Sequence, residues 1–454
     1  MYVQQLYTNC LAQAAYYVES NGEVLIIDPL RDPGPYLDLA KKRKAKIRYV
    51  FETHFHADFV SGHLELSRKT GATIIFGPNA NPKYKAFIAK DLEPFELGKT
   101  KFQVLHTPGH TIESSCVLLF NEEGKPHCIF TGDTLFAGDV GRPDLLSGNL
   151  NKEELAGMLF ESLKKIKALP DDLLVYPGHG AGSACGKNIG KETVTTIGIQ
   201  KRRNYALGNL SKNEFIKTVT TGLPNPPAYF FKDASINISG YDSYDAIMSK
   251  ELIALHLDPF KTEVKDGAII LDTRNAADFA RGFIPGSINV GLNGDFAVWA
   301  GTMIAFGTPL VIVAEKGKER ESIVRLARIG FDTIKGYLNG GFEIWSANGE
   351  PVDFVKEIEM KDLKQLHTKD TIILDVRRND EHEKGAIPNA LHVPLDFLHN
   401  HMSELNKDKN YVVYCAGGYR SMIAVSILKK YGIKHIQNLK NGINAYSKPK
   451  LAKS

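Results

Sequence analysis

An internal repeat in the second half of the chain restricts its fold more than any other sequence feature. The segment IILDTRNAADFARGFIPGSINV, Ile269 to Val290, matches IILDVRRNDEHEKGAIPNALHV, Ile372 to Val393, almost position for position. Each copy is followed by an apolar strand, a loop and a helix, and then by a similar closing segment. Because strands that alternate with helices favour parallel sheets, the repeat predicts two α/β domains of about 100 residues each.

The residues before the repeat predict a further α/β domain. Apolar runs such as EVLIIDP, IRYVFETH and HCIFTGDT alternate with polar turns and are typical of strands. Helices are expected at about residues 61–70 and 152–168, and Ser211 with Glu214 forms a capping box before a short helix. The Pro-rich stretch LPNPPAYF indicates a surface connection. We therefore divide the chain into domains at residues 1–240, 241–355 and 356–454.

The composition favours small-molecule chemistry. The chain has 454 residues, of which 43% are hydrophobic and 24% charged, and a net charge of +4, which is small for a protein that binds nucleic acid or a membrane surface. The N-terminus lacks a signal-like apolar core, and no run approaches the roughly 20 apolar residues of a membrane span. We expect a cytoplasmic homo-oligomer without nucleic-acid or membrane partners.

One cysteine has a context that indicates a nucleophile. The five cysteines show no paired spacing, which argues against a disulfide framework. Cys415 follows the apolar strand YVVY and precedes AGGYRS and a helix, so Gly417 and Gly418 allow a curled backbone at a helix N-terminus, where a thiolate is favoured. Arg420 could bind a persulfide or an oxyanion. The alternative is a small buried hydrophobic residue. We place Glu315 at the matching position of the first copy, which predicts an inactive domain.

The repeat resembles the rhodanese family. The segments LDVR, GAIPNALHVP and CAGGYRS mark the second copy, and LDTR and GFIPGSINV mark the first as degenerate. The resemblance implies two α/β rhodanese domains and sulfur transfer through a persulfide on Cys415.

A set of metal-ligating residue types follows the strands of the first domain. The run FETHFHADFVSGH carries three of them, and further ones occur in TPGHT, TGDT and YPGHG. These residues are His54, His56, Asp58, His110, Asp133 and His179. Because strand ends gather at one edge of a sheet, the set predicts a metal site.

This ordered set resembles the metallo-β-lactamase fold, which implies an αββα sandwich. In the two-metal hydrolases of that fold, such as the glyoxalase II type, a histidine after Asp58 helps to hold the second ion, whereas this chain has Phe59. One metal held by two histidines and one carboxylate suits non-haem Fe(II) oxygen chemistry, although the ligand types alone also permit Zn(II).

The persulfide dioxygenases within that fold have such a mononuclear site. The resemblance implies one Fe(II) per chain on His54, His110 and Asp133, with His56, Asp58 and His179 orienting ligands and waters. Arg142, in GDVGRPDLL, is assigned to substrate binding.

Taken together, the domains resemble the persulfide dioxygenase–rhodanese fusions of the CstB type. The resemblance implies that a low-molecular-weight thiol persulfide is oxidised by O2 to sulfite, and that the rhodanese passes a second sulfane sulfur to sulfite to form thiosulfate. Glutathione, coenzyme A and bacillithiol are all candidate thiol carriers.

Two other classes of function remain open at this point. One is a zinc thioester hydrolase of the glyoxalase II type that carries rhodanese modules, and the other is a sulfur-binding or regulatory protein with a structural metal. Two features have competing interpretations: Cys185 could relay sulfur or simply fill a Gly-rich loop, and QKRRN, residues 200–204, could bind an anion or form a solvated helix face.

Overall fold

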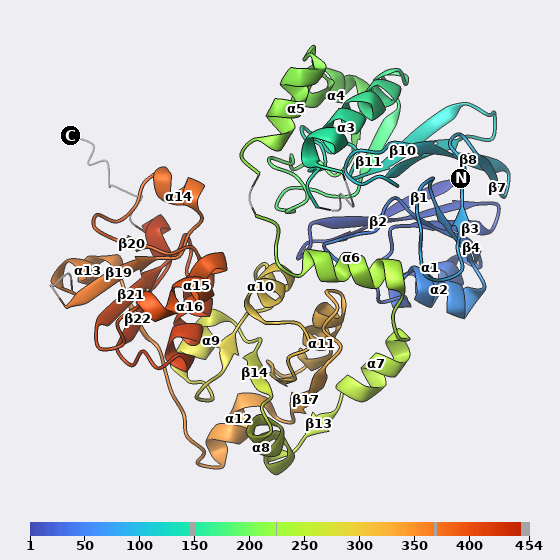
Figure 1. The fold of residues 1–454 in the computed structure, drawn as a ribbon. Coiled ribbons are helices and arrows are strands. Elements are labelled where there is room, and N and C mark those ends of the chain that lie inside the picture. The colour runs from blue at the N-terminus through green and yellow to red at the C-terminus, as the bar shows by residue number, and fades with distance from the viewer. Residues whose placement is uncertain (146–149, 224, 367–369, 446–454) are drawn as a thin grey trace, which may run out of the picture. The chain divides into compact units, whose positions relative to one another are not determined.

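The computed structural model describes residues 1–145, 150–223, 225–366 and 370–445 (Figure 1). The chain forms two compact units. Unit 1 contains Met1–Ile247 and Leu326–Gly330, and the rest of the described chain forms unit 2.

Unit 1 is built on two six-stranded sheets. The first has the order β1-β2-β3-β4-β5-β6, with β1 (Tyr2–Thr8), β2 (Gln13–Ser20), β3 (Glu23–Ile27), β4 (Lys46–Glu52), β5 (Thr73–Phe76) and β6 (Phe87–Ile88). The second has the order β12-β11-β10-β9-β8-β7, with β7 (Pro94–Leu97), β8 (Thr100–His106), β9 (Ser115–Phe120), β10 (Pro126–Gly132), β11 (Leu174–Pro177) and β12 (Thr195–Thr196). Side chains from both sheets, including Tyr16, Phe51, Phe102 and Phe130, form one hydrophobic layer.

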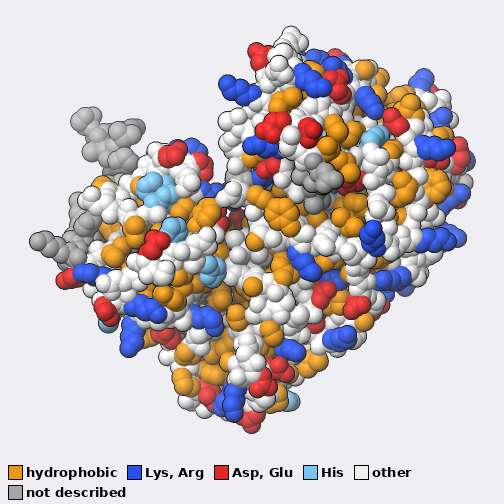
Figure 2. Space-filling view, in the orientation of Figure 1, with side chains coloured by type: hydrophobic (Ala, Val, Ile, Leu, Met, Phe, Trp, Pro, Cys, Tyr) orange, Lys and Arg blue, Asp and Glu red, His pale blue; other side chains and the backbone are white. Residues whose placement is uncertain are grey.

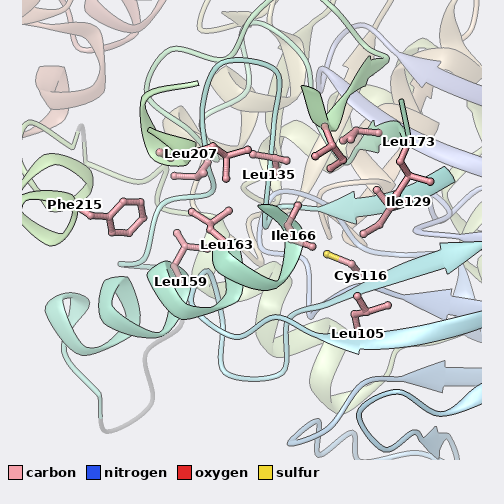
Figure 3. Close-up of a cluster of buried hydrophobic side chains, with 14 of the residues drawn as sticks. Leu105, Cys116, Ile129, Leu135, Leu159, Leu163, Ile166, Leu173, Leu207 and Phe215 are labelled. Carbon is pink, nitrogen blue, oxygen red and sulfur yellow. The ribbon is translucent and has the colours of Figure 1, made fainter. Parts of the chain in front are cut away.

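Helices cover the outer face of each sheet. Tyr36 of α1 (Gly34–Arg43) and Leu66 of α2 (His63–Thr70) pack on the first sheet. The second sheet is covered by α3 (Lys152–Lys167), α4 (Ile197–Arg203), η1 (Tyr205–Leu207) and α5 (Lys212–Thr220). Figure 3 shows Leu159, Leu163 and Ile166 of α3 meeting the sheet residues of this cluster. The predicted αββα sandwich is therefore confirmed.

The local predictions for this unit are largely correct. The capping box of Ser211 and Glu214 precedes α5, and Gly71 ends α2 in the left-handed conformation with a φ of 74°. The predicted surface connection is wrong at its end, because Tyr229 and Phe230 are buried; Pro224 of that stretch lies outside the described residues. These aromatic residues lead into α6 (Phe230–Ser239), which was not predicted.

Unit 2 contains two five-stranded sheets whose strand pairs are all parallel. The first has the order β13-β17-β16-β14-β15, with β13 (Ala254–Leu255), β14 (Ile269–Asp272), β15 (Ile288–Asn289), β16 (Leu310–Val313) and β17 (Ile334–Leu338). The second has the order β18-β22-β21-β19-β20, with β18 (Lys356–Ile358), β19 (Thr371–Asp375), β20 (Leu391–His392), β21 (Asn410–Tyr414) and β22 (Ile436–Leu439). The repeat in the sequence is thus a repeat of the same sheet topology.

The helices of the two copies also correspond. The sequence boundary of the two units, after Ile247, falls within α7 (Tyr244–Glu251). The first copy has α8 (Leu257–Lys265), α9 (Ala276–Arg281), α10 (Phe296–Met303), α11 (Glu319–Ala327) and α12 (Gly341–Ala347). The second has α13 (Met360–Leu366), α14 (Asn379–Glu383), η2 (Leu395–Phe397), α15 (Leu398–His401), η3 (Met402–Glu404), α16 (Tyr419–Lys430) and η4 (Gly442–Ala445).

On the face shown in Figure 2, basic and acidic side chains are interspersed. Among the described residues, no helix is both long and apolar enough to cross a lipid bilayer.

Candidate functional site

Buried imidazole, carboxylate and thiol groups gather in unit 1 where its strands end. The described residues contain three groups of potential metal ligands, and within each group the ligand atoms lie within 4.8 Å of one another. The groups are His54 with His110 and Asp133, Asp58 with His179 and Cys185, and Asp28 with Glu52 and His56.

In the first group, backbone and side-chain acceptors orient both histidines. The Thr53 hydroxyl donates to Asp28 at 2.8 Å, so its oxygen accepts from Nδ1 of His54 at 3.0 Å. Nδ1 of His110 donates to the Arg142 carbonyl at 2.8 Å. Both rings therefore carry their proton on Nδ1 and present the Nε2 lone pair to Asp133, whose Oδ2 lies 4.0 Å from His54 and 3.5 Å from His110.

His179 is oriented in the same way on the other side of Asp133. Its Nδ1 donates to the Ala12 carbonyl at 3.2 Å. Its Nε2 faces Asp58 Oδ2 at 3.4 Å and Asp133 Oδ1 at 3.6 Å. The two oxygens of Asp133 thus face two different sets of donors.

The residues of the first group fit a bound cation. His54 Nε2 and both carboxylate oxygens of Asp133 are buried without a hydrogen-bond partner among the described residues. Burial, followed by the neighbouring histidines, holds the pKa of His54 well below its usual range, so the ring is neutral. Buried polar atoms without partners are costly, and a metal ion would satisfy all three.

His56 belongs to a separate group, although its ring centroid is only 4.2 Å from that of His54. Its Nε2 lies 3.1 Å from Asp28 Oδ1 and 3.4 Å from Glu52 Oε2. Burial would lower the pKa of His56, but the two carboxylates raise it well above the usual value. Burial also raises the pKa of Glu52 to about 7. His56 is therefore held as part of a buried ion cluster beside the first group.

The loop that carries these residues is held by one amide of α6. Asn237, which is buried, donates from Nδ2 to the carbonyls of His56 at 2.8 Å and Phe59 at 2.7 Å. Its Oδ1 accepts from the Ser61 N–H at 2.9 Å. The Phe59 ring is fully buried and stacks on His56 with centroids 4.3 Å apart.

Arg142 and Cys185 lie together. The Arg142 side chain is buried and forms two hydrogen bonds with Asp144, and its backbone N–H donates to the Cys185 carbonyl at 2.9 Å. Burial, then Asp58 and Asp133, raises the pKa of the Cys185 thiol well above its usual range. Arg142 thus supports the loop that brings this thiol beside the carboxylates, and a substrate-binding role for it stays a prediction.

The thiol of unit 2 has different surroundings. Cys415, 1% exposed, follows β21, and Gly418 in the left-handed conformation (φ 100°) donates its N–H to Sγ at 3.1 Å. Sγ also lies 3.6 Å from the Ser421 hydroxyl, which donates to the Gly418 carbonyl. Gly418 is the N-cap of α16, so the thiol lies at a helix N-terminus that favours negative charge.

The other loop residues are only partly directed at this thiol. Gly417 is exposed, and a Cβ at this position would meet no atom within 4 Å. Arg420 forms hydrogen bonds with both carboxylate oxygens of Glu381, at 2.5 and 2.7 Å. Burial alone would lower the pKa of Arg420, but Glu381 raises it. The predicted anion-binding role of Arg420 remains a prediction.

The pairing of strands in the two sheets of unit 2 corrects the predicted match between Glu315 and Cys415. Asp272 pairs with Val313, and Asp375 pairs with Tyr414, so the residue after each strand is Ala314 in the first copy and Cys415 in the second. Glu315 is therefore not at the matching position: it is exposed and follows Ala314, which is buried. The two copies have loops of different lengths, which hid this register in the sequence.

Sequence reasoning missed several residues that support the site. Asp28 ends the strand motif EVLIIDP and could have been noticed there, as could Glu52, two residues before His54. No sequence pattern indicates Asn237 or the Ala12 carbonyl. Residues 200–203 form the end of α4, and Asn204 is its C-cap; Arg202 and Arg203 are exposed, as expected for a solvated helix face, whereas Gln200 and Asn204 are buried.

Comparisons with known proteins agree with this geometry. The profile of the Metallo-beta-lactamase superfamily matches residues 8–179, and that of the Rhodanese-like domain matches residues 257–348 and 359–449. A hydroxyacylglutathione hydrolase from Tolumonas auensis is 31% identical over 168 residues, which cover 36% of this chain and 60% of that relative.

Two solved structures are also similar. A metallo-beta-lactamase from Staphylococcus aureus subsp. aureus COL has a TM-score of 0.68 and 31% identity, covering 74% of this chain and 99% of that chain. ETHE1 from Myxococcus xanthus has a TM-score of 0.46 and 29% identity, covering 53% of this chain and 99% of that chain. From the sheets, the buried donors and the family matches, the chain has a domain of the metallo-β-lactamase superfamily followed by two rhodanese-like domains.

Proposed function

We propose that the protein is an Fe(II) persulfide dioxygenase coupled to a sulfurtransferase, of the CstB type that the sequence resembles. One Fe(II) per chain would be held by His54, His110 and Asp133. The first reaction is RSSH + O2 + H2O → RSH + SO3²⁻ + 2H⁺, in which the sulfane sulfur loses four electrons to O2. The substrates are a low-molecular-weight thiol persulfide, O2 and sulfite.

The observation that carries the proposal is a compact set of two imidazoles and one carboxylate on a chain that also carries a thiol in a rhodanese loop. The hydrogen bonds of both Nδ1 atoms leave Nε2 as the ligand atom. Two histidines and one carboxylate leave positions for substrate and O2, as non-haem iron sites require.

Phe59 supports the mononuclear form of the site. A hydrophobic ring stacks on His56 where a two-metal hydrolase has an imidazole. Asp58 and His179 then remain beside Asp133 to orient the persulfide and water. When bound, Fe(II) would supply a position at which persulfide and O2 react. The protein supplies fixed Nε2 donors, and the buried site keeps bulk water away.

The second activity is assigned to Cys415. Its thiolate would attack the outer sulfur of the persulfide RSSH, so that the S–S bond of RSSH breaks, the proton passes to the leaving thiol as RSH, and Cys415–S–S⁻ remains. Sulfite then attacks that outer sulfur, which gives thiosulfate and restores the Cys415 thiolate. The Gly418 N–H and the α16 N-terminus would stabilise the negative charge in both steps. Two sites on one chain also raise the effective concentration of sulfite at the transferase.

A thioester hydrolase remains the second candidate, for a specific reason. The matched segment is 31% identical to a hydroxyacylglutathione hydrolase, and Asp58, His179 and Cys185 offer a second set of donors beside Asp133. That function would require two divalent ions and activity without O2.

The decisive experiment is metal analysis of protein prepared without oxygen, combined with oxygen uptake on a small-molecule persulfide. We expect about one iron per chain and, for each O2 consumed, one sulfite, counted as free sulfite plus thiosulfate. Stoichiometric zinc that supports thioester hydrolysis, without oxygen uptake on persulfides, would overturn the proposal.

A further inference from the structure

We propose that the degenerate rhodanese domain supplies one wall of the transferase site, namely the loop of residues 291–295. Tyr419 is the positioning residue through which this wall fixes the conformation of the Cys415 loop. The inference rests on the proposed transferase function and assigns a role to a domain without a nucleophile. Both domains belong to unit 2.

Tyr419 connects the nucleophile loop to the other domain. It is the first residue of α16 and follows Gly418, whose N–H contacts Cys415 Sγ. Its hydroxyl donates to the Gly291 carbonyl of the degenerate domain at 2.7 Å. A tether at Tyr419 therefore restrains the peptide unit that contacts the thiol.

The Tyr419 ring packs closely against Gly294 of the degenerate domain. A Cβ on Gly294 would lie 2.5 Å from two carbons of the Tyr419 ring. Any larger residue there would displace the tyrosine, so the close approach requires glycine at this position. In the degenerate loop, Lys318, which directly precedes α11, is exposed and pairs with Glu321 of that helix.

The wall is itself held in place. Nη1 of Arg325, in α11, donates to the Leu292 carbonyl at 2.7 Å. The Asn289 side chain donates to the carbonyls of Asp272 and Arg274, and its backbone N–H donates to Ser426 Oγ of α16 at 3.0 Å. The helix that begins at Tyr419 is thus fastened to the degenerate domain at several points along its length, including Lys429 with Asp353 and Lys430 with the Gly286 carbonyl near its end.

This arrangement explains the burial of α16. Residues 421–428 of this helix are all buried, so it is enclosed on every side and not only on the face toward its own sheet. A helix covered on one side alone would expose polar residues on the other. The degenerate domain is therefore a structural part of the active half.

The test uses the full chain and measures thiosulfate formation from a small-molecule persulfide and sulfite. Tyr419→Phe removes the hydroxyl, and we expect kcat to fall about two- to tenfold, the effect of one lost hydrogen bond. The KM for sulfite should change less, because no contact with sulfite is removed. The matched control is Tyr411→Phe, which removes a similar hydrogen bond to the Asn406 carbonyl within the active domain, and it should retain kcat.

A second measurement separates positioning from stability. Iodoacetamide alkylation of Cys415 is followed at several pH values by mass spectrometry of its peptide. The pH profile of the alkylation rate should shift to higher pH in Tyr419→Phe and in Gly294→Ala, because Gly418 is less well held in both variants. Gly294→Ala should add no loss of activity to Tyr419→Ala if it acts through the ring.

The outcomes distinguish the inference from the proposed function. Wild-type kcat and alkylation profiles in both single variants, with Cys415→Ser inactive, would reject the tether and leave the transferase. Additive losses in the double variant would also reject it. If Cys415→Ser still forms thiosulfate at the wild-type rate, the transferase function and the tether both fail.

Discussion

The proposed metal ligands of unit 1 come from the ends of separate strands, whereas the thiol site of unit 2 lies in one continuous loop between β21 and α16. A site assembled from several strand ends can lose one donor and keep its fold and the other donors, as at Phe59. A site held in one loop loses its chemistry with a single change, as in the degenerate copy, where Ala314 replaces the nucleophile but the Asp272–Arg274 pair is retained. The two sites should therefore respond independently to mutation.

The largest effect is expected at the proposed metal ligands. His110→Ala or Asp133→Ala should remove iron and lower oxygen uptake by more than about 100-fold, because a lost ligand leaves the ion with too few donors. Metal analysis and an oxygen electrode measure both effects. Thiosulfate formation from supplied persulfide and sulfite should continue in the same variants, and its loss would show that the sites are not independent.

Cys415→Ser should produce the converse result. A hydroxyl is not ionised near neutral pH and holds no sulfane sulfur, so transfer should stop. Oxygen uptake on a preformed small-molecule persulfide should continue, and sulfite should accumulate in place of thiosulfate. If oxygen uptake also stops, Cys415 must deliver the substrate to the metal, and the comparison of two separate sites is wrong.

Phe59→His should restore one metal-binding side chain to the site of unit 1. An imidazole near Asp58 and His179 should strengthen binding of a second divalent ion by about tenfold, equivalent to about 1.4 kcal/mol. Calorimetric titration with Zn(II) measures the change, and Phe59→Leu is the control without a donor. Tight binding of two ions by the wild type would refute our interpretation of Phe59.

A smaller effect is expected for the ion pair beside the thiol loop. Burial opposes ionisation of Glu381, but the Arg420 guanidinium lowers its pKa below the usual value. Because the pKa is lowered in the folded state, the pair stabilises the protein at neutral pH, and this contribution is lost as the pH falls below about 4.

Glu381→Gln should therefore cost about 1 kcal/mol at pH 7 and nothing once the carboxylate is protonated. Denaturant unfolding at several pH values measures the difference. Asp380→Asn, in the exposed pair with Lys384, should cost less. A loss for Glu381→Gln that is constant with pH would contradict the assignment.

The smallest effect is expected at Glu315. Its side chain is exposed and lies one position past the residue that matches Cys415. Glu315→Ala should leave thiosulfate formation and stability within the error of measurement. A clear loss of transfer would mean that the degenerate loop takes part in the chemistry.

The repeat and the strand ends could be predicted from the sequence because they depend on local patterns. The period of apolar residues located the central strands, and the polar residues after them identified His54, His110 and Asp133 as candidates. The hairpin of β1 and β2 was missed, since polar and apolar residues alternate there irregularly.

The contacts between distant segments could not be predicted. Asp28 supports His54 through Thr53, and Tyr419 reaches Gly291, but neither pair shares a local motif. The match of Cys415 to Ala314 depended on strand register, because one inserted residue in a loop shifts a sequence alignment without changing the sheet.

The hydrogen bonds from Asn237 to the His56–Phe59 loop have a consequence for biosynthesis. A nascent chain that has emerged through His179 contains every proposed ligand, yet it lacks the amide that holds the His56–Phe59 loop. At about 5–20 residues per second, roughly 3 to 12 seconds pass before Asn237 is added. During translation, the His56–Phe59 loop therefore cannot reach its final conformation until α6 has been synthesised, well after the last proposed metal ligand.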